Sequence, residues 1–95
     1  MIKHIVLWKL KEEFDRELVF RELYDEFEAL THKVTGLASW SMSLGFDGFD
    51  VALETVFEDR ESFDRYVVQP EHQQYKKIPE KYRSERAACD YEFES

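Results

Sequence analysis

The stretch FDVALETVFEDRESFDRYVVQPEHQ, residues 49–73, decides the fold. Its first part alternates apolar and acidic residues at period two as far as Phe57, which is typical of a strand. Asp59 then stands where it can cap a helix with an apolar stripe at i, i+3, i+4 spacing, made by Phe63, Tyr66 and Val67. Gln69 and Pro70 end this helix and begin another. The stretch therefore predicts a strand followed by two short helices that meet at a tight corner.

The segments on either side complete an α+β pattern. Residues 2–10, 37–44 and 86–93 alternate as strands do, and residues 18–30 carry apolar side chains at helical spacing. Residues 71–82 predict a helix that Pro79 limits to about two turns. The order β-α-β-β-α-α-β predicts the ferredoxin-like split βαβ fold, a four-stranded antiparallel sheet with helices on one face. We expect residues 1–95 to form a single domain.

One face of such a sheet remains without helices. The strand at residues 2–10 is apolar on both faces at its centre, and the strand at residues 37–44 adds an apolar face formed by Trp40, Met42 and Leu44. We expect a second copy of the chain to cover what the helices leave open. The sequence therefore predicts a homodimer in which two sheets form an α+β barrel.

The composition restricts the classes of partner. A formal net charge of -8 argues against nucleic acid and against an anionic membrane surface, because both favour clustered Lys and Arg. No apolar run approaches the roughly 20 residues that a membrane span needs, so we expect a cytoplasmic protein. The lone Cys89 excludes an internal disulfide, and we interpret it as a small apolar strand residue. No HxH, HExxH or compact carboxylate motif occurs, so neither a metal nor another cofactor is predicted.

Three motifs resemble the stress-responsive A/B barrel domain family, also called dimeric alpha+beta barrel proteins. They are MIKHIVLWKLK at the N-terminus, residues 49–73, and CDYEF near the C-terminus. The resemblance covers nearly the whole chain and implies the fold and the homodimer described above. Many relatives carry a histidine directly before the proline of the corner, where this chain has Gln69.

The resemblance also implies a site. A plant member of the family, olivetolic acid cyclase, carries out an aldol condensation on a polyketide, and its functional residues fall here on His4, Tyr66 and His72. Its pocket-lining positions fall on Val6, Trp8, Leu53 and Tyr75, where the side chains differ in size, so the substrate is not expected to be the same. Some stress-responsive plant relatives are associated with magnesium. The implied pocket lies between the sheet and the helices.

Three hypotheses about function follow from these residues. The first is a small homodimeric stress-response domain that binds a small molecule. The second is a polyketide-cyclase-like lyase, in which His72 acts as base while Tyr66 and His4 orient the substrate, since an imidazole with a pKa of about 6.5 can take a proton and a phenol can stabilise an enolate. The third is a purely structural dimer with a closed pocket. A cavity that reaches His72 favours the first two, and His32 is expected to be solvated.

Overall fold

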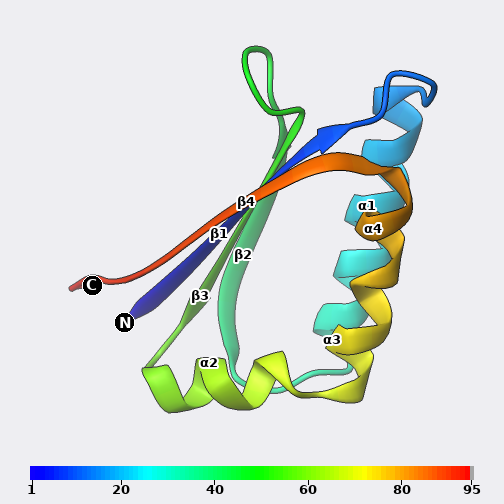
Figure 1. Cartoon of the computed structure of the whole chain (residues 1–95). Coiled ribbons are helices and arrows are strands. Elements are labelled where there is room, and N and C mark those ends of the chain that lie inside the picture. The colour runs from blue at the N-terminus through cyan, green and yellow to red at the C-terminus, as the bar shows by residue number, and fades with distance from the viewer. Residues whose placement is uncertain (95) are drawn as a thin grey trace.

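The computed structural model describes residues 1–94 and shows a single curved sheet of four antiparallel strands (Figure 1). The strands are β1 (Ile2–Leu10), β2 (Leu37–Leu44), β3 (Val51–Phe57) and β4 (Arg83–Glu92), and their order across the sheet is β2-β3-β1-β4. The first strand is therefore central, paired with β3 on one side and β4 on the other. The predicted ferredoxin-like fold class is confirmed.

Helix α1 (Arg16–Thr31) begins at Asp15, whose side chain accepts hydrogen bonds from the first-turn backbone N–H groups. Its inward face is formed by Val19, Leu23, Phe27 and Leu30. Leu18, which the apolar pattern placed on that face, is 71% exposed, and Val19 takes its place. Neighbouring residues lie about 100° apart on a helix, so a stripe assigned one residue early points part of its first turn into solvent.

Helix α2 (Arg60–Val67) and helix α3 (Pro70–Tyr75) form the predicted corner, with Asp59 as the N-cap of α2 and Pro70 in the first turn of α3. The expectation for Pro79 was wrong. The helix breaks earlier, at Lys76, and Pro79 lies in the first turn of a further helix, α4 (Lys77–Tyr82). A proline is tolerated there because first-turn N–H groups have no partner within the helix. The described chain therefore has one more helix than the predicted order.

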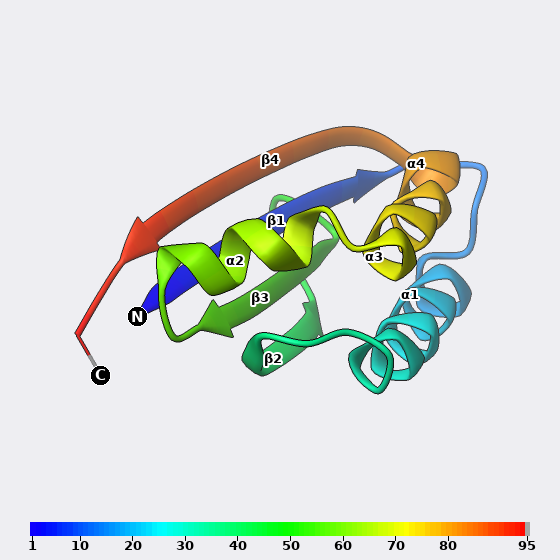
Figure 2. The ribbon, with the colours of Figure 1, turned by 90° about the horizontal axis from the view of Figure 1, so that it is seen from below.

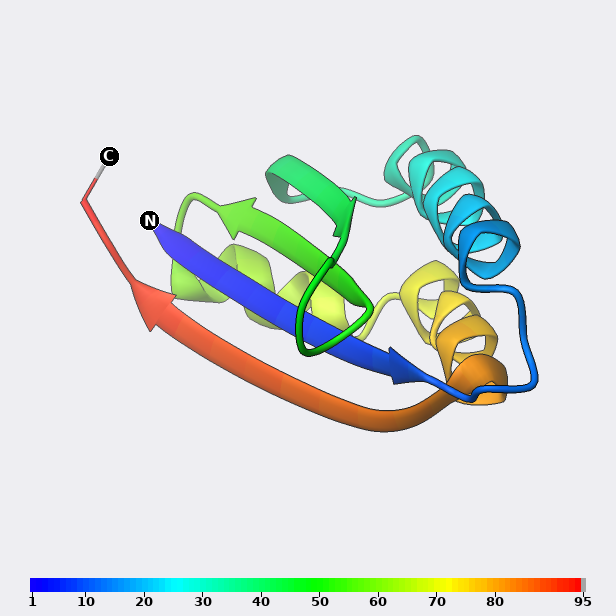
Figure 3. The same ribbon diagram turned by 90° about the horizontal axis from the view of Figure 1, so that it is seen from above.

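All four helices lie on one side of the sheet. Helix α2 lies in front of β1 and β3 in Figure 2 and behind them in Figure 3, which shows the opposite side. The covered face of β2 carries Trp40, whose ring packs 5.1 Å from Tyr24 and 5.0 Å from Phe27 of α1, measured between centroids. The Trp40, Met42 and Leu44 face is thus part of the core of one subunit and is not left for a partner.

The opposite, outer face of the sheet is free of helices. Cross-strand pairing of Ile5 with Cys89 and Glu54 places these three side chains together on it. Ile5 and Leu7 are half-buried there, whereas Cys89 is exposed. Strand β1, one of the two interior strands, therefore contributes apolar side chains to both faces, as predicted. No helix among residues 1–94 is long and apolar enough to cross a membrane.

Strand β4 begins at Arg83, three residues earlier than the pattern indicated, and carries an irregularity near its start. Lys9 pairs with Glu85 but Leu10 pairs with Arg83, so Ser84 is an extra residue without a partner in the register. Such a β-bulge changes the face to which the following side chains point.

Candidate functional site

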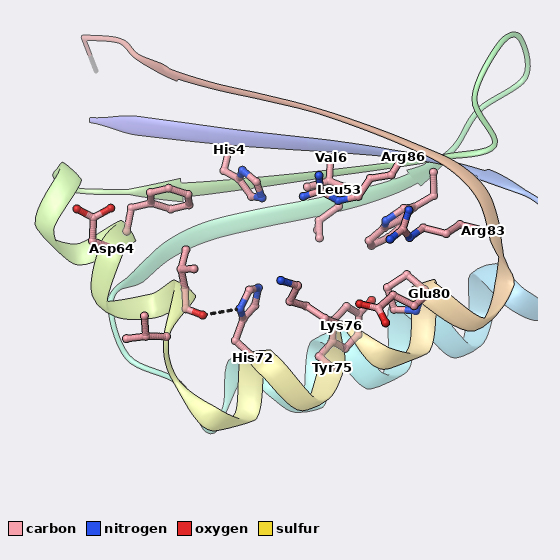
Figure 4. Close-up of a pocket in the computed structure, with 15 residues that line it drawn as sticks. His4, Val6, Leu53, Asp64, His72, Tyr75, Lys76, Glu80, Arg83 and Arg86 are labelled. Atoms are coloured by element: carbon pink, nitrogen blue, oxygen red, sulfur yellow. Dashed lines mark hydrogen bonds between the residues drawn. The ribbon is translucent and has the colours of Figure 1, made fainter.

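A cavity of about 480 Å³ lies between the inner face of the sheet and the helices α2, α3 and α4 (Figure 4). Its volume falls within the range of small-molecule sites, about 300–1,000 Å³. The apolar wall consists of Val6, Trp8, Leu53, Phe63, Val67, Val68, Tyr75 and Pro79. The polar groups are His4, Asp64, His72, Lys76, Glu80, Arg83 and Arg86. The structure thus brings six of the seven sequence-predicted site residues to one cavity: His4, Val6, Trp8, Leu53, His72 and Tyr75.

His72 enters the cavity from the first turns of α3, directly after the corner. Its Nδ1 lies 3.1 Å from the carbonyl oxygen of Val67. A carbonyl only accepts, so Nδ1 carries the proton and Nε2 keeps its lone pair. Burial lowers the pKa of His72 below its ordinary value of 6.5, with the hydrogen bond to Val67 acting in the opposite direction. His72 is therefore a neutral imidazole at pH 7 that is able to accept a proton at Nε2.

His4 lies across the cavity from His72, on the central strand (Figure 4). Its Nδ1 is hydrogen-bonded to the Asp90 carboxylate on the adjacent β4, with which it pairs across the strands. Its ring also stacks at 5.3 Å from Phe63 of α2. Asp90 thus fixes the ring and leaves Nε2 for the cavity. Asp90 was not predicted from the sequence, although antiparallel pairing of the first and last strands would have placed a carboxylate opposite His4.

Tyr66 does not lie among the residues that line the cavity. It is 2% exposed and sits behind His72, with ring centroids 4.5 Å apart, and it packs at 5.0 Å from Phe57 on its other side. Burial raises the pKa of its hydroxyl well above the ordinary value, so the phenol stays neutral. The structure therefore places Tyr66 as a support for the His72 ring, and not in the lining of the pocket as the resemblance implied.

Tyr75 lines the cavity with its ring alone. Its hydroxyl donates a hydrogen bond of 2.9 Å to the backbone carbonyl of Leu23, in the buried interior of α1. The ring also packs edge-on against Phe27 at 5.2 Å. Tyr75 thus holds α3 against α1 and fixes the wall from which His72 and Lys76 project.

Gln69, at the position where many relatives carry histidine, points away from the cavity. Its Nε2 donates to the Thr35 carbonyl at 3.0 Å, and its Oε1 accepts from the Thr35 N–H at 3.2 Å. This pair of bonds fastens the corner between α2 and α3 to the loop that follows α1. In this loop, Gly36 has a φ of +96°, and a Cβ atom at this position would lie 3.3 Å from the Ser62 carbonyl oxygen, which explains the glycine.

The third histidine lies outside the cavity. His32 is exposed at the C-cap of α1, away from the cavity. Within residues 1–94, no group of three or more His, Cys, Asp or Glu side chains is arranged to hold a metal ion. The histidine, lysine and arginine side chains that line the cavity are able to transfer protons or to make polar contacts.

The curved antiparallel sheet with helices on one face places the chain in the class of ferredoxin-like folds. The chain belongs within that class to the stress-responsive A/B barrel domain family, whose family model matches residues 2–93. No curated protein matches the chain in sequence.

Solved structures share the fold over almost the whole chain. A dimeric protein of unknown function with a ferredoxin-like fold from Bacteroides fragilis is 28% identical, with a TM-score of 0.85 over 97% of this chain and 95% of that one. A family member with a ferredoxin-like fold from Mesorhizobium loti is 15% identical, with a TM-score of 0.82 over 99% and 97%. Hydroxynitrile lyase from Passiflora edulis is also 15% identical, with a TM-score of 0.82 over 95% and 90%.

Proposed function

We propose that this protein is a homodimeric stress-response A/B barrel domain that binds a small, partly apolar molecule in the cavity between sheet and helices. The observation that carries the proposal is the cavity of about 480 Å³ with His4 and His72 on opposite walls. A cavity of this size, lined by apolar side chains and a few convergent polar groups, is a typical ligand site. It also counts against the structural dimer with a closed pocket.

The homodimer is supported by the outer face of the sheet. Ile5 and Leu7 lie there with no helix above them, and Tyr91, which pairs with Lys3, is 42% exposed on the same face. Apolar side chains left without cover on a sheet face are typical of an interaction site. The 28% identical Bacteroides fragilis relative is a dimer. A cytoplasmic location stays part of the proposal, and cell fractionation tests it.

A fragment screen observed by ligand NMR tests small-molecule binding. We expect hits that are displaced by one another and lost in the variant His72→Ala. His32→Ala is the matched control, because it removes the same side chain from an exposed position outside the cavity. Hits that bind wild type, His72→Ala and His32→Ala equally would place binding elsewhere and contradict the proposal.

A second candidate is a lyase that enolises its substrate, and the tautomer of His72 favours it. Nδ1 donates to Val67, so Nε2 is positioned to take a proton from a carbon next to a carbonyl, which leaves an enolate. His4, fixed by Asp90, would contact the substrate oxygen from the other wall, while Tyr66 would position the His72 ring. The fold shared with a hydroxynitrile lyase is compatible with such chemistry but shows the fold alone.

Deuterium exchange distinguishes the lyase from the binding domain. Cyclic and linear β-keto esters are incubated in D₂O with the protein, and NMR follows exchange at the carbon between the carbonyls. Enolisation predicts faster exchange than in buffer, reduced by about 10²–10⁴-fold in His72→Gln and unchanged in His32→Gln. If every ester exchanges at the buffer rate while binding is confirmed, the lyase hypothesis is rejected and the binding-domain hypothesis remains.

A further inference from the structure

Three cationic side chains face the cavity of a protein whose net charge is -8. Lys76 projects from the helix side, and Arg83 and Arg86 project from the sheet side (Figure 4). No carboxylate among residues 1–94 lies within ion-pairing distance of any of the three, although Lys and Arg side chains form four ion pairs elsewhere in that part of the chain. Cations kept together without a partner repel one another, and an anionic ligand would relieve that repulsion.

The two arginines share the cavity because of the β-bulge in β4. In a regular strand, residues three apart point to opposite faces of the sheet. Ser84 is an extra residue in the register between Lys9 and Leu10, so the strand places Arg83 and Arg86 on the same, inner face. Bulges are common next to functional sites because they redirect a side chain in this way.

The two acids on the cavity wall do not neutralise this cluster. Asp64 is paired with Arg60, its Oδ1 lying 3.5 Å from Arg60 Nε, at the end of the cavity beside Phe63. Glu80 faces the sheet from α4, at the same end of the cavity as Arg83 (Figure 4). A single unpaired carboxylate therefore stands against three cations at this end, which leaves a net positive field.

We propose that the ligand carries a carboxylate on an apolar body. The carboxylate would be bound by Arg83 and Arg86, whose planar guanidinium groups match it in a two-pronged geometry, with Lys76 adding charge from the opposite wall. The apolar body would lie against Val6, Trp8 and Leu53, and its far end would reach His4 and His72. This inference rests on the proposed small-molecule function and names the class of molecule.

Matched pairs of probes test the proposal. Octanoate and octanamide, and 2-naphthoate and 2-naphthamide, have the same bodies and differ in the charge of the head group. In calorimetric titrations at pH 7.5, we expect each carboxylate to have a dissociation constant at least about tenfold lower than that of its amide. Hydrogen bonds to charged groups are stronger than those between neutral groups. The preference is expected to weaken as salt is added.

Variants assign the preference to residues. Arg83→Gln/Arg86→Gln is expected to bring each carboxylate to within about threefold of its amide, and Lys76→Gln to reduce the preference in part. The control Arg21→Gln/Lys77→Gln removes the same amount of charge from exposed positions outside the cavity. We expect this control to keep the preference for carboxylates over amides. Urea melts confirm folding of the double variant, and Lys76→Gln, at an exposed site, gives a second reading if that variant unfolds.

Two results would overturn the proposal. Amides that bind as tightly as carboxylates, with no effect of Arg83→Gln/Arg86→Gln, would show that the cations do not select the ligand while leaving small-molecule binding intact. Failure of all four probes to bind would overturn the carboxylate proposal and count against the small-molecule function as well.

Discussion

The loss of stability in His72→Ala tests whether His72 is a site residue or a residue of the core. The ring is half-buried, packs on Tyr66 at 4.5 Å and donates one hydrogen bond to the Val67 carbonyl. A hydrogen bond contributes about 0.5–1.5 kcal/mol net, and the larger cost of an orphaned acceptor does not arise, because Gln73 Nε2 donates to the same carbonyl. We expect His72→Ala to lower the free energy of unfolding by about 1 kcal/mol at pH 8.

The pH dependence of this loss follows from the lowered pKa of His72. The unfolded chain takes up a proton at about pH 6.5, whereas the folded protein takes it up only at a lower pH. The stability contributed by the neutral ring is therefore fully present above pH 6.5 and is lost as the pH falls through the folded-state pKa. The difference between wild type and His72→Ala should therefore shrink as the pH falls from 8 to 5.

Urea melts at pH 8, 6.5 and 5, at one protein concentration, measure both effects, with His32→Ala as the control. A midpoint shift equivalent to several kcal/mol at unchanged slope would show that His72 is a core residue. A difference that grows as the pH falls would contradict the assigned direction of the pKa. Either result would refute the reasoning that makes His72 available to a ligand.

Three further predictions test the rest of the fold. Phe27→Ala, at a buried ring packed against Trp40 and Tyr75, should lower the free energy of unfolding by about 3–5 kcal/mol, whereas Leu18→Ala on the exposed side of α1 should stay within about 0.5 kcal/mol in the same urea melts. Ile5→Glu on the outer sheet face should convert the proposed homodimer to monomer in sedimentation at micromolar concentration, and a dimer that survives would place the interface elsewhere. Asp59→Ala should lower the urea midpoint of unfolding. This loss is present above pH 3.8 and disappears as the pH falls through the pKa of Asp59, which the Ser62 N–H lowers; a loss that persists in acid would contradict the cap.

Periodicity predicted the elements of this fold well because period two and period 3.6 are local properties. The corner at Gln69 and Pro70 and the cap at Asp59 are likewise set by the chemistry of single residues. The face that carries Trp40 was assigned to a partner because alternation tells which side chains share a face and not what covers it. Pro79 was predicted to end a helix. It lies in the first turn of α4 instead, because the helix breaks at Lys76, and this break could not be recognised from the pattern.

The site was predicted in part, and the Lys, Arg, Asp and Glu side chains on its wall were missed. The resemblance placed His4 and His72 at one cavity. Tyr66 lies near the end of α2, and the direction of its side chain there puts it behind His72. Arg83 and Arg86 could not be assigned to one face from a strand pattern, because the bulge at Ser84 reverses the alternation. Asp90 depended on the register between the first and last strands.

The bonds between Gln69 and Thr35 lie outside the lining of the cavity but help to set its shape. They hold the corner that carries His72 to the end of α1, so the separation of the two histidine walls is set from outside. We expect substitutions at these two positions to alter the gap between the two walls without changing any residue that lines the cavity. A comparison restricted to lining positions would overlook these two residues.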